Sequence, residues 1–207
     1  ISEPERVFAV HKGYADAGAE FITANTFGAN SLKYDNVDEL VKAGVALAKK
    51  AGKYVALDIG PTGKLLKPMG DLEFERAVEL FAEVVRAGKD GSDVAIIETM
   101  SDMYELKAAV IAVKENSDLP IITSMIFDES GRLLTGGDVK SAVAMLEGLR
   151  VDAIGFNCGL GPKQMIPLVK ELRECTSLPI LVMPNAGLPE SVDGKTVYNV
   201  SPDEFAQ

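Results

Sequence analysis

The residue of this sequence whose side chain could do the most chemistry is Cys158, which ends the tetrad Gly155-Phe156-Asn157-Cys158. The tetrad closes an apolar run and is followed by Gly159-Leu160-Gly161-Pro162. A thiol at the end of a buried strand can bind a metal ion or act as a nucleophile, but either role needs partner groups. Free cysteines are also common as small apolar core residues. The residues alone leave a chemical role and a packing role open.

Few groups in the chain could act together with this thiol. The second cysteine, Cys175, ends a predicted helix on the opposite side of a βα unit from Cys158. The single histidine, His11, falls in a predicted helix before the first strand and is expected to be an ordinary helix-face residue. Because a zinc site needs several protein ligands, a metal at Cys158 would require further ones. We expect no catalytic Cys–His pair within the chain.

Two carboxylates also close apolar runs. Glu98 follows Val94-Ala95-Ile96-Ile97, and burying its charge is costly unless a cation or a hydrogen-bond donor meets it. It could form a salt bridge with a neighbouring loop, anchor a substrate ammonium group or act as a general base. Asp58, just before Ile59-Gly60-Pro61-Thr62-Gly63, could equally cap a turn or contact a ligand.

Two further segments combine amides with glycine. They are Asn25-Thr26-Phe27-Gly28-Ala29-Asn30 and Pro184-Asn185-Ala186-Gly187-Leu188-Pro189. Either could be a plain loop with asparagine in a turn conformation. Because both follow predicted strands at equivalent positions, the pattern favours a shared site.

All these residues lie at the ends of short apolar runs that alternate with longer amphipathic ones. The runs predict strands at Glu20–Phe27, Tyr54–Ile59, Val94–Met100, Leu119–Phe127, Asp152–Cys158 and Leu178–Pro184. Helices are predicted at Glu3–Ala17, Val37–Ala51, Leu72–Ala87, Met103–Asn116, Val139–Leu149 and Lys163–Cys175. Nearly continuous apolar strands are typical of a parallel sheet that is covered on both faces.

The alternation predicts an α/β protein, and the polar strand ends favour a (β/α)8 TIM barrel. The polar residues that end the predicted strands are Asn25-Thr26, Asp58, Glu98-Thr99, Ser124, Asn157-Cys158 and Asn185. One mouth ringed by many strand ends is the barrel layout, whereas no Gly-x-Gly-x-x-Gly loop marks a doubly wound sheet. Since this barrel typically needs about 250 residues, we expect about six of its eight strands here. Residues 1–207 are expected to form a single partial barrel domain.

Composition narrows the partners. The formal net charge is −10 and the basic residues are dispersed, which argues against a nucleic-acid partner. No apolar run approaches the length of a membrane span, and two cysteines do not make a disulfide framework. The sequence therefore predicts a cytoplasmic protein.

The last residues of the sequence have the pattern of a helix start. Ser201 is a capping residue, Pro202 suits the first helical position and Glu204 lies three residues after the cap, which suggests a fragment.

Five motifs in order resemble one family. They are Thr23-Ala24-Asn25-Thr26-Phe27-Gly28-Ala29-Asn30, Asp58-Ile59-Gly60-Pro61-Thr62-Gly63, Glu98-Thr99-Met100-Ser101-Asp102, Gly155-Phe156-Asn157-Cys158 and Pro184-Asn185-Ala186-Gly187. Together they resemble the homocysteine S-methyltransferase domain, most closely the homocysteine-binding module of cobalamin-dependent methionine synthase. The resemblance covers essentially the whole chain.

The resemblance implies a barrel that holds a catalytic zinc ion through three cysteine thiolates, of which Cys158 matches the first. The other two belong to a Gly-Gly-Cys-Cys-Gly motif that this sequence lacks, and the opening Asp-Gly-Ala/Gly-Met-Gly strand is also absent. Both gaps fall at the termini, as expected for a truncated sequence.

The resemblance also implies roles for individual residues. Glu98, with Thr99, would hold the ammonium group of homocysteine, and Asn25, Thr26 and Asp58 would line the substrate site. Asn185 would occupy the open zinc position when substrate is absent, and Asn157 would shape the Cys158 loop.

These expectations combine into one leading hypothesis. The chain would belong to a zinc-dependent methyltransferase that activates homocysteine as a thiolate and forms methionine. The methyl donor would be methylcobalamin on a separate corrinoid-binding module, with betaine and S-methylmethionine open as alternatives. The competing hypotheses are a metal-free barrel lyase with Glu98 as general base, and a non-catalytic truncated barrel. With one thiolate of the set, this chain alone is expected to be inactive.

Overall fold

The computed structural model, which describes residues 2–187 and 189–206, contains one six-stranded parallel sheet in the order β1-β2-β3-β4-β5-β6. The strands are β1 (Phe21–Thr23), β2 (Tyr54–Ile59), β3 (Val94–Met100), β4 (Ile121–Met125), β5 (Ala153–Asn157) and β6 (Ile180–Met183). The helices are α1 (Pro4–Asp16), α2 (Val37–Lys49), α3 (Phe74–Gly88), η1 (Lys89–Gly91), α4 (Met103–Asn116), α5 (Val139–Gly148), α6 (Pro162–Cys175) and α7 (Pro202–Ala206).

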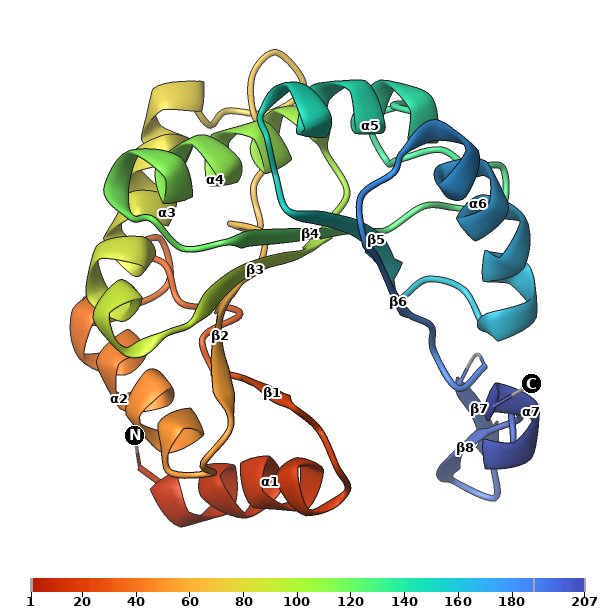
Figure 1. The fold of residues 1–207 in the computed structure, drawn as a ribbon, viewed down its shortest axis with the longest axis horizontal. Coiled ribbons are helices and arrows are strands. Elements are labelled where there is room, and N and C mark those ends of the chain that lie inside the picture. Colours follow the sequence, from red (N-terminus) through yellow and green to blue (C-terminus); the bar gives the residue numbers. More distant parts are fainter. Residues whose placement is uncertain (1, 188, 207) are drawn as a thin grey trace.

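The sheet curls into part of a barrel. Figure 1 shows the strands as an arc with α2 to α6 along its outer side. β1 and β6 pair with only one neighbour each, so they are the two edges of the arc. This arrangement confirms the predicted α/β fold and the incomplete TIM barrel of six strands.

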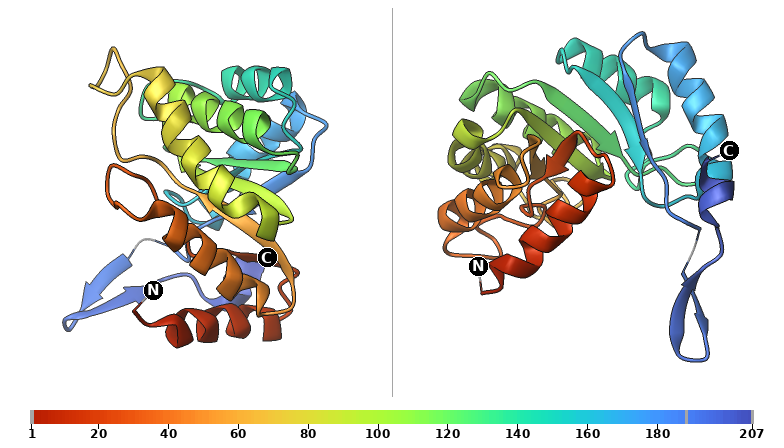
Figure 2. Two further views of the ribbon diagram at one scale, coloured as in Figure 1. Left: turned by 90° about the vertical axis from the view of Figure 1, so that its left-hand side faces the viewer. Right: turned by 60° about the horizontal axis from the view of Figure 1, so that its bottom comes forward.

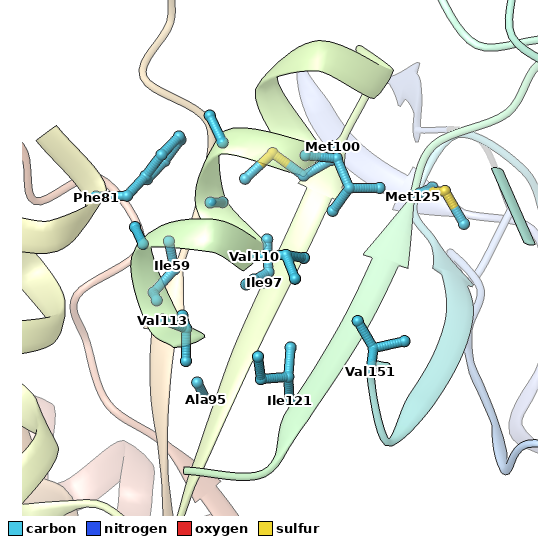
Figure 3. Close-up of a cluster of buried hydrophobic side chains, with 14 of the residues drawn as sticks. Ile59, Phe81, Ala95, Ile97, Met100, Val110, Val113, Ile121, Met125 and Val151 are labelled. Atoms are coloured by element: carbon cyan, nitrogen blue, oxygen red, sulfur yellow. The ribbon is translucent and has the colours of Figure 1, made fainter. Parts of the chain in front are cut away.

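Two apolar layers hold the arc together, because successive side chains of a strand point to opposite faces. The larger layer packs strand residues such as Ile97 and Ile121 against the helices, above all α4, which contributes Val110 and Val113 (Figure 3). The smaller layer lies on the inner face of the arc. It contains Ala56, Val94 and Ile96, with Ile122, Leu181 and Met183 against them.

The inner face changes from apolar to polar at the carboxyl ends of the strands. Alternation places Asp58, Glu98 and Ser124 two residues beyond the apolar inner residues Ala56, Ile96 and Ile122. In β5, Ile154 and Phe156 belong to the outer layer, so Asn157 faces inward. The strand pattern thus builds a ring of polar groups above an apolar floor.

Side-chain caps begin two helices, and the helix start predicted at Ser201 is confirmed. The carboxylate of Asp102 accepts a hydrogen bond from the Glu105 N–H (2.7 Å) and begins α4. At the start of α7, the Ser201 hydroxyl accepts from the Glu204 N–H (3.3 Å) while the Glu204 carboxylate accepts from the Ser201 N–H (3.1 Å). This reciprocal pair is a capping box.

Several predicted boundaries are wrong by a few residues. The predicted strand Glu20–Phe27 is reduced to Phe21–Thr23, so Asn25 and Thr26 lie in the following loop. β4 and β6 begin at Ile121 and Ile180, two residues after their predicted starts, because the proline just before each strand has no N–H for the ladder. The predicted helix Leu72–Ala87 runs from Phe74 to Gly88.

An antiparallel hairpin is missing from the sequence-based expectation. β7 (Pro189–Val192) pairs with β8 (Lys195–Tyr198) through the two-residue turn Asp193-Gly194. Both turn residues have positive φ, 52° and 74°, as an Asp-Gly hairpin turn requires. Every residue of the two strands is exposed, and Figure 2 shows the hairpin projecting from the barrel. With no buried face, the hairpin lacks the apolar pattern that identifies the other strands.

The expectation for His11 is also wrong. It is the buried residue of α1, only 6% exposed, and its Nδ1 has no hydrogen-bond partner among the described residues. Hydropathy does not indicate this burial, because the neighbouring apolar residue Val10 is 57% exposed while the polar His11 is enclosed.

Gly155 is the tightest point of the sheet. A Cβ added there would lie 1.9 Å from the Leu181 carbonyl oxygen on β6. Because that atom belongs to a paired strand, we expect Gly155→Ala to lower the free energy of unfolding by about 2 kcal/mol or more in urea titrations. Gly148→Ala, where the new Cβ meets nothing within 4 Å, is the matched control and should be neutral or slightly stabilising. Equal stability of the two variants would contradict this packing.

Among the described residues, no helix combines the length and the apolar character that crossing a membrane requires.

Candidate active site

Asn157 lies at the centre of the polar ring and is almost completely buried, at 3% exposure. Its Oδ1 accepts hydrogen bonds from the Thr99 N–H (3.0 Å) and the Ser124 hydroxyl (2.7 Å). Its Nδ2 donates to Thr99 Oγ1 (2.7 Å) and to Cys158 Sγ (3.3 Å). One amide side chain therefore joins the carboxyl ends of β3, β4 and β5.

The two residues on either side of this amide have strained backbones. Thr99 has φ of 65° and Cys158 has φ of 56°, in the left-handed region that non-glycine residues seldom adopt. Each such residue costs about 1–3 kcal/mol, so the surrounding contacts must hold it in place. The four Asn157 hydrogen bonds provide that hold. Strain of this kind is concentrated at functional sites.

The Cys158 turn is also tied to the segment after β6. The Cys158 N–H donates to the Met183 carbonyl (3.1 Å), and the Asn185 N–H donates to the Leu160 carbonyl (3.0 Å). These bonds place the Asn185 segment beside the cysteine turn. Cys158 and Asn185 are both partly buried, so the thiol is neither sealed in the core nor freely exposed.

The carboxylates of β2 and β3 form the electrostatic centre of the ring. Burial, and secondarily the charge of nearby Glu98, raises the pKa of Asp58 from 3.8 to about 8. Burial likewise raises the pKa of Glu98. Asp58 Oδ1 is buried without a hydrogen-bond partner in the described part of the chain. Two poorly solvated acids side by side favour a cation that would share them.

The raised pKa of Asp58 makes stability depend on pH. Between its ordinary value of 3.8 and about 8, the folded chain keeps a proton on Asp58 that the unfolded chain has released. The free energy of unfolding is therefore expected to fall as the pH rises through this window. Urea titrations should show a smaller fall in Asp58→Asn, with Glu98 contributing what remains.

Asp138→Asn is the control for this measurement. Asp138 is a helix cap whose pKa is lowered by its hydrogen bonds to Ser141, so it changes the pH dependence of the free energy of unfolding only at acid pH. It should leave the slope above about pH 5 unchanged. A parent slope of zero between about pH 5 and 8 would contradict the assignment to Asp58.

The two candidates from the loop after β1 take different positions. Thr26 is buried and its hydroxyl donates to the Asp58 carbonyl (2.7 Å), so it joins the ends of β1 and β2. Asn25 is exposed. With Thr23, Asp58 and Met183, it lines a cavity of about 460 Å³ beside β1. Asn25 therefore has access to a ligand, whereas Thr26 supports the main chain that carries Asp58.

The sequence did not indicate Thr62 and Glu105, which lie 2% and 3% exposed at the same mouth. The Thr62 hydroxyl donates to Glu105 Oε1 (2.6 Å). A carboxylate three residues after the cap Asp102 reads as an ordinary first-turn residue, so only its buried position distinguishes it.

The donors for a metal ion are incomplete in the part of the chain that the structure describes. It contains no group of three or more His, Cys, Asp or Glu side chains arranged to hold one. Cys158 supplies one thiol in a suitable setting, since it is partly exposed and its sulfur accepts an N–H hydrogen bond. Any zinc site here would need ligands from outside these residues.

The chain is similar to proteins that methylate homocysteine or form methionine, by the names they carry. A family model described as homocysteine S-methyltransferase matches residues 1–207. Methionine synthases of Mycobacterium leprae and Mycobacterium tuberculosis are each 30% identical over the whole chain. The chain spans only 19% of the length of either protein.

A solved structure with a similar fold is the metallated form of the homocysteine methyltransferase MmuM from Escherichia coli. It superimposes with a TM-score of 0.80 over 90% of this chain and 74% of its own, at 24% identity. Its apo form gives a TM-score of 0.77, with 26% identity and coverage of 90% and 73%.

Proposed function

Because the chain belongs to the homocysteine S-methyltransferase family, we propose that it forms most of the barrel that binds homocysteine and presents its sulfur for methylation to methionine. The observation that supports this most strongly is the Asn157 amide. It joins Cys158 Sγ to the turn at Thr99, the residue after Glu98. A candidate sulfur-side group and a candidate amine-side group are therefore positioned by one buried side chain.

In this proposal, the carboxylates bind the amine end of the substrate. Glu98 accepts hydrogen bonds from the ammonium group, and Asp58 contributes the second negative charge from β2. Thr99 positions Glu98 through its hydrogen bonds to Asn157, and Asn25 borders the cavity that Asp58 also lines. The positive charge of the ammonium group would offset the cost of ionising two buried acids whose pKa values are both raised.

Cys158 serves the sulfur end of the substrate. We propose that it is one ligand of a zinc ion whose two other thiolates come from outside this chain, and that Asn185 lies at the remaining position when substrate is absent. A bound zinc ion would lower the pKa of the substrate thiol and keep the sulfur nucleophilic as a thiolate. Asn157 would hold Cys158 Sγ in place through its N–H.

The methyl donor is part of the proposal too. The chain spans 19% of the methionine synthases it matches, which leaves room for other modules. We propose methylcobalamin, carried by a corrinoid-binding module of the same protein, as the donor. This chain alone is proposed to be inactive, because one thiol cannot complete the metal site.

The function is tested with the full-length protein that contains this chain. Methionine formation from homocysteine is measured with methylcobalamin after purification, after zinc removal by a chelator, and after zinc is restored. We expect loss of activity on removal and recovery on restoration. Activity that survives complete zinc removal would instead favour metal-free chemistry with Glu98 as general base.

A further inference from the structure

A buried carboxylate outside the polar ring joins a loop to a helix at the mouth of the barrel. Glu105 lies in the first turn of α4, and Thr62 lies in the loop between β2 and α3. The Thr62 N–H (2.8 Å) and the Thr62 hydroxyl (2.6 Å) both donate to Glu105 Oε1. The start of the β2–α3 loop is therefore fixed to the helix that follows β3.

Further hydrogen bonds fix the start of α4 on one side of this connection and the turn after β2 on the other. The Glu105 N–H donates to the cap Asp102 (2.7 Å), which follows the end of β3. On the other side, the Gly60 N–H donates to the Phe27 carbonyl (3.1 Å). A Cβ on Gly60 would lie 2.5 Å from the Phe27 ring, so the turn has no room to move toward β1. The end of β2 is clamped between the loop after β1 and α4.

The clamp acts where the sheet itself no longer joins the two strands. The last Cα partners of β2 and β3 are Ile59 and Ile97, so Glu98 lies beyond the paired region. Asp58 and Glu98 carry like charges when both are ionised, and their repulsion would separate the two strand ends. The hydrogen bonds between Thr62 and Glu105 oppose that separation.

We propose that Glu105 is a positioning residue that keeps the ends of β2 and β3 at the spacing at which Asp58 and Glu98 share the substrate ammonium group. Glu105 acts through Thr62 and does not contact the substrate. This inference rests on the proposed function, since it assigns Glu105 to the amine end of the same site.

The test uses the full-length protein with Glu105→Leu, which removes the acceptor of both bonds, and Glu105→Gln, whose amide oxygen can still accept both bonds. We expect Glu105→Leu to raise KM for homocysteine about tenfold or more, with kcat within about threefold of the parent. Glu105→Gln should recover KM to within about threefold. Amide hydrogen exchange at Thr62 should accelerate in Glu105→Leu and not in Glu105→Gln.

Glu147→Leu is the matched control. Glu147 lies in the last turn of α5, near the amino ends of the strands, and its carboxylate accepts a hydrogen bond from the hydroxyl of Thr176, the residue after α6 (2.5 Å). The Glu147→Leu variant therefore removes a hydrogen bond between Glu and Thr side chains away from the mouth, and KM for homocysteine should not change.

An unchanged KM in Glu105→Leu, or equal impairment in Glu105→Gln, would overturn the proposal. If Glu105→Leu does not fold, Thr62→Val removes only the hydroxyl donor and should raise KM in the same direction by about threefold. An unchanged KM there would also overturn it. A parent that does not methylate homocysteine would refute the proposed function instead. Amide exchange at Thr62, faster in Glu105→Leu and not in Glu105→Gln, would still decide whether Glu105 holds the loop.

Discussion

Replacing Cys158 with alanine in the full-length protein is expected to lower kcat/KM for homocysteine methylation by about a thousandfold or more. The proposed zinc ion would lose one thiolate, and the substrate sulfur would lose the charge that keeps it deprotonated. The fold should survive, because Cys158 is only partly buried and lies at a strand end. Zinc content by elemental analysis and methionine formation are the measurements.

Cys175→Ala is the matched control for this prediction. Cys175 is the other free thiol of the chain, also partly buried, and it ends α6 away from the polar ring. It should leave zinc content and activity unchanged. If Cys158→Ala retains both zinc and turnover at the parent level, Cys158 is not a ligand.

Replacing Asn157 with leucine should have the second-largest effect. The change removes all four hydrogen bonds of the amide and leaves the Thr99 N–H and the Ser124 hydroxyl buried without their acceptor. We expect the free energy of unfolding to fall by about 2–4 kcal/mol. We also expect kcat/KM to fall about a hundredfold, because Cys158 and Thr99 would leave their strained conformations.

Two comparisons separate positioning from general stability. Asn157→Asp keeps the acceptor for the Thr99 N–H and the Ser124 hydroxyl but loses the N–H donor to Thr99 Oγ1 and Cys158 Sγ, so it should recover stability more than activity. Asn116→Leu removes an amide that bonds the Ala112 carbonyl at the end of α4, away from the mouth, and should leave kcat/KM unchanged. Equal loss of activity in the Asn116 variant would contradict a specific role for Asn157.

The strand ends could be predicted from sequence because their pattern is local. Apolar runs such as Val94–Ile97 must be buried, and the polar residue that ends each run must then lie at the edge of the sheet. This reasoning placed Glu98, Asp58 and Cys158 at one mouth, and the structure confirms a parallel sheet that gathers those ends. The missing strands could be expected for the same reason, since six βα units are too few to close a barrel of this type.

The hydrogen bonds within the mouth could not be predicted, because they join residues far apart in sequence. Asn157 and Thr99 are separated by 58 positions, and Glu105 and Thr62 by 43. The periodicity of apolar residues does not indicate which polar side chains will be hydrogen-bonded to each other across the ring. The positive φ of Thr99 and Cys158 is also invisible in sequence, since neither is a glycine. The bond from the Thr26 hydroxyl to the Asp58 carbonyl spans 32 positions and likewise has no signal in the sequence.

The most direct test of the central claim is X-ray absorption at the zinc edge of the full-length protein, with and without homocysteine. If Cys158 binds the zinc ion that receives the substrate sulfur, homocysteine should increase the sulfur scattering around zinc in the parent. Cys158→Ala should show less sulfur scattering than the parent before substrate is added. The same sulfur coordination in the parent and in Cys158→Ala, or no change on adding homocysteine, would contradict the account.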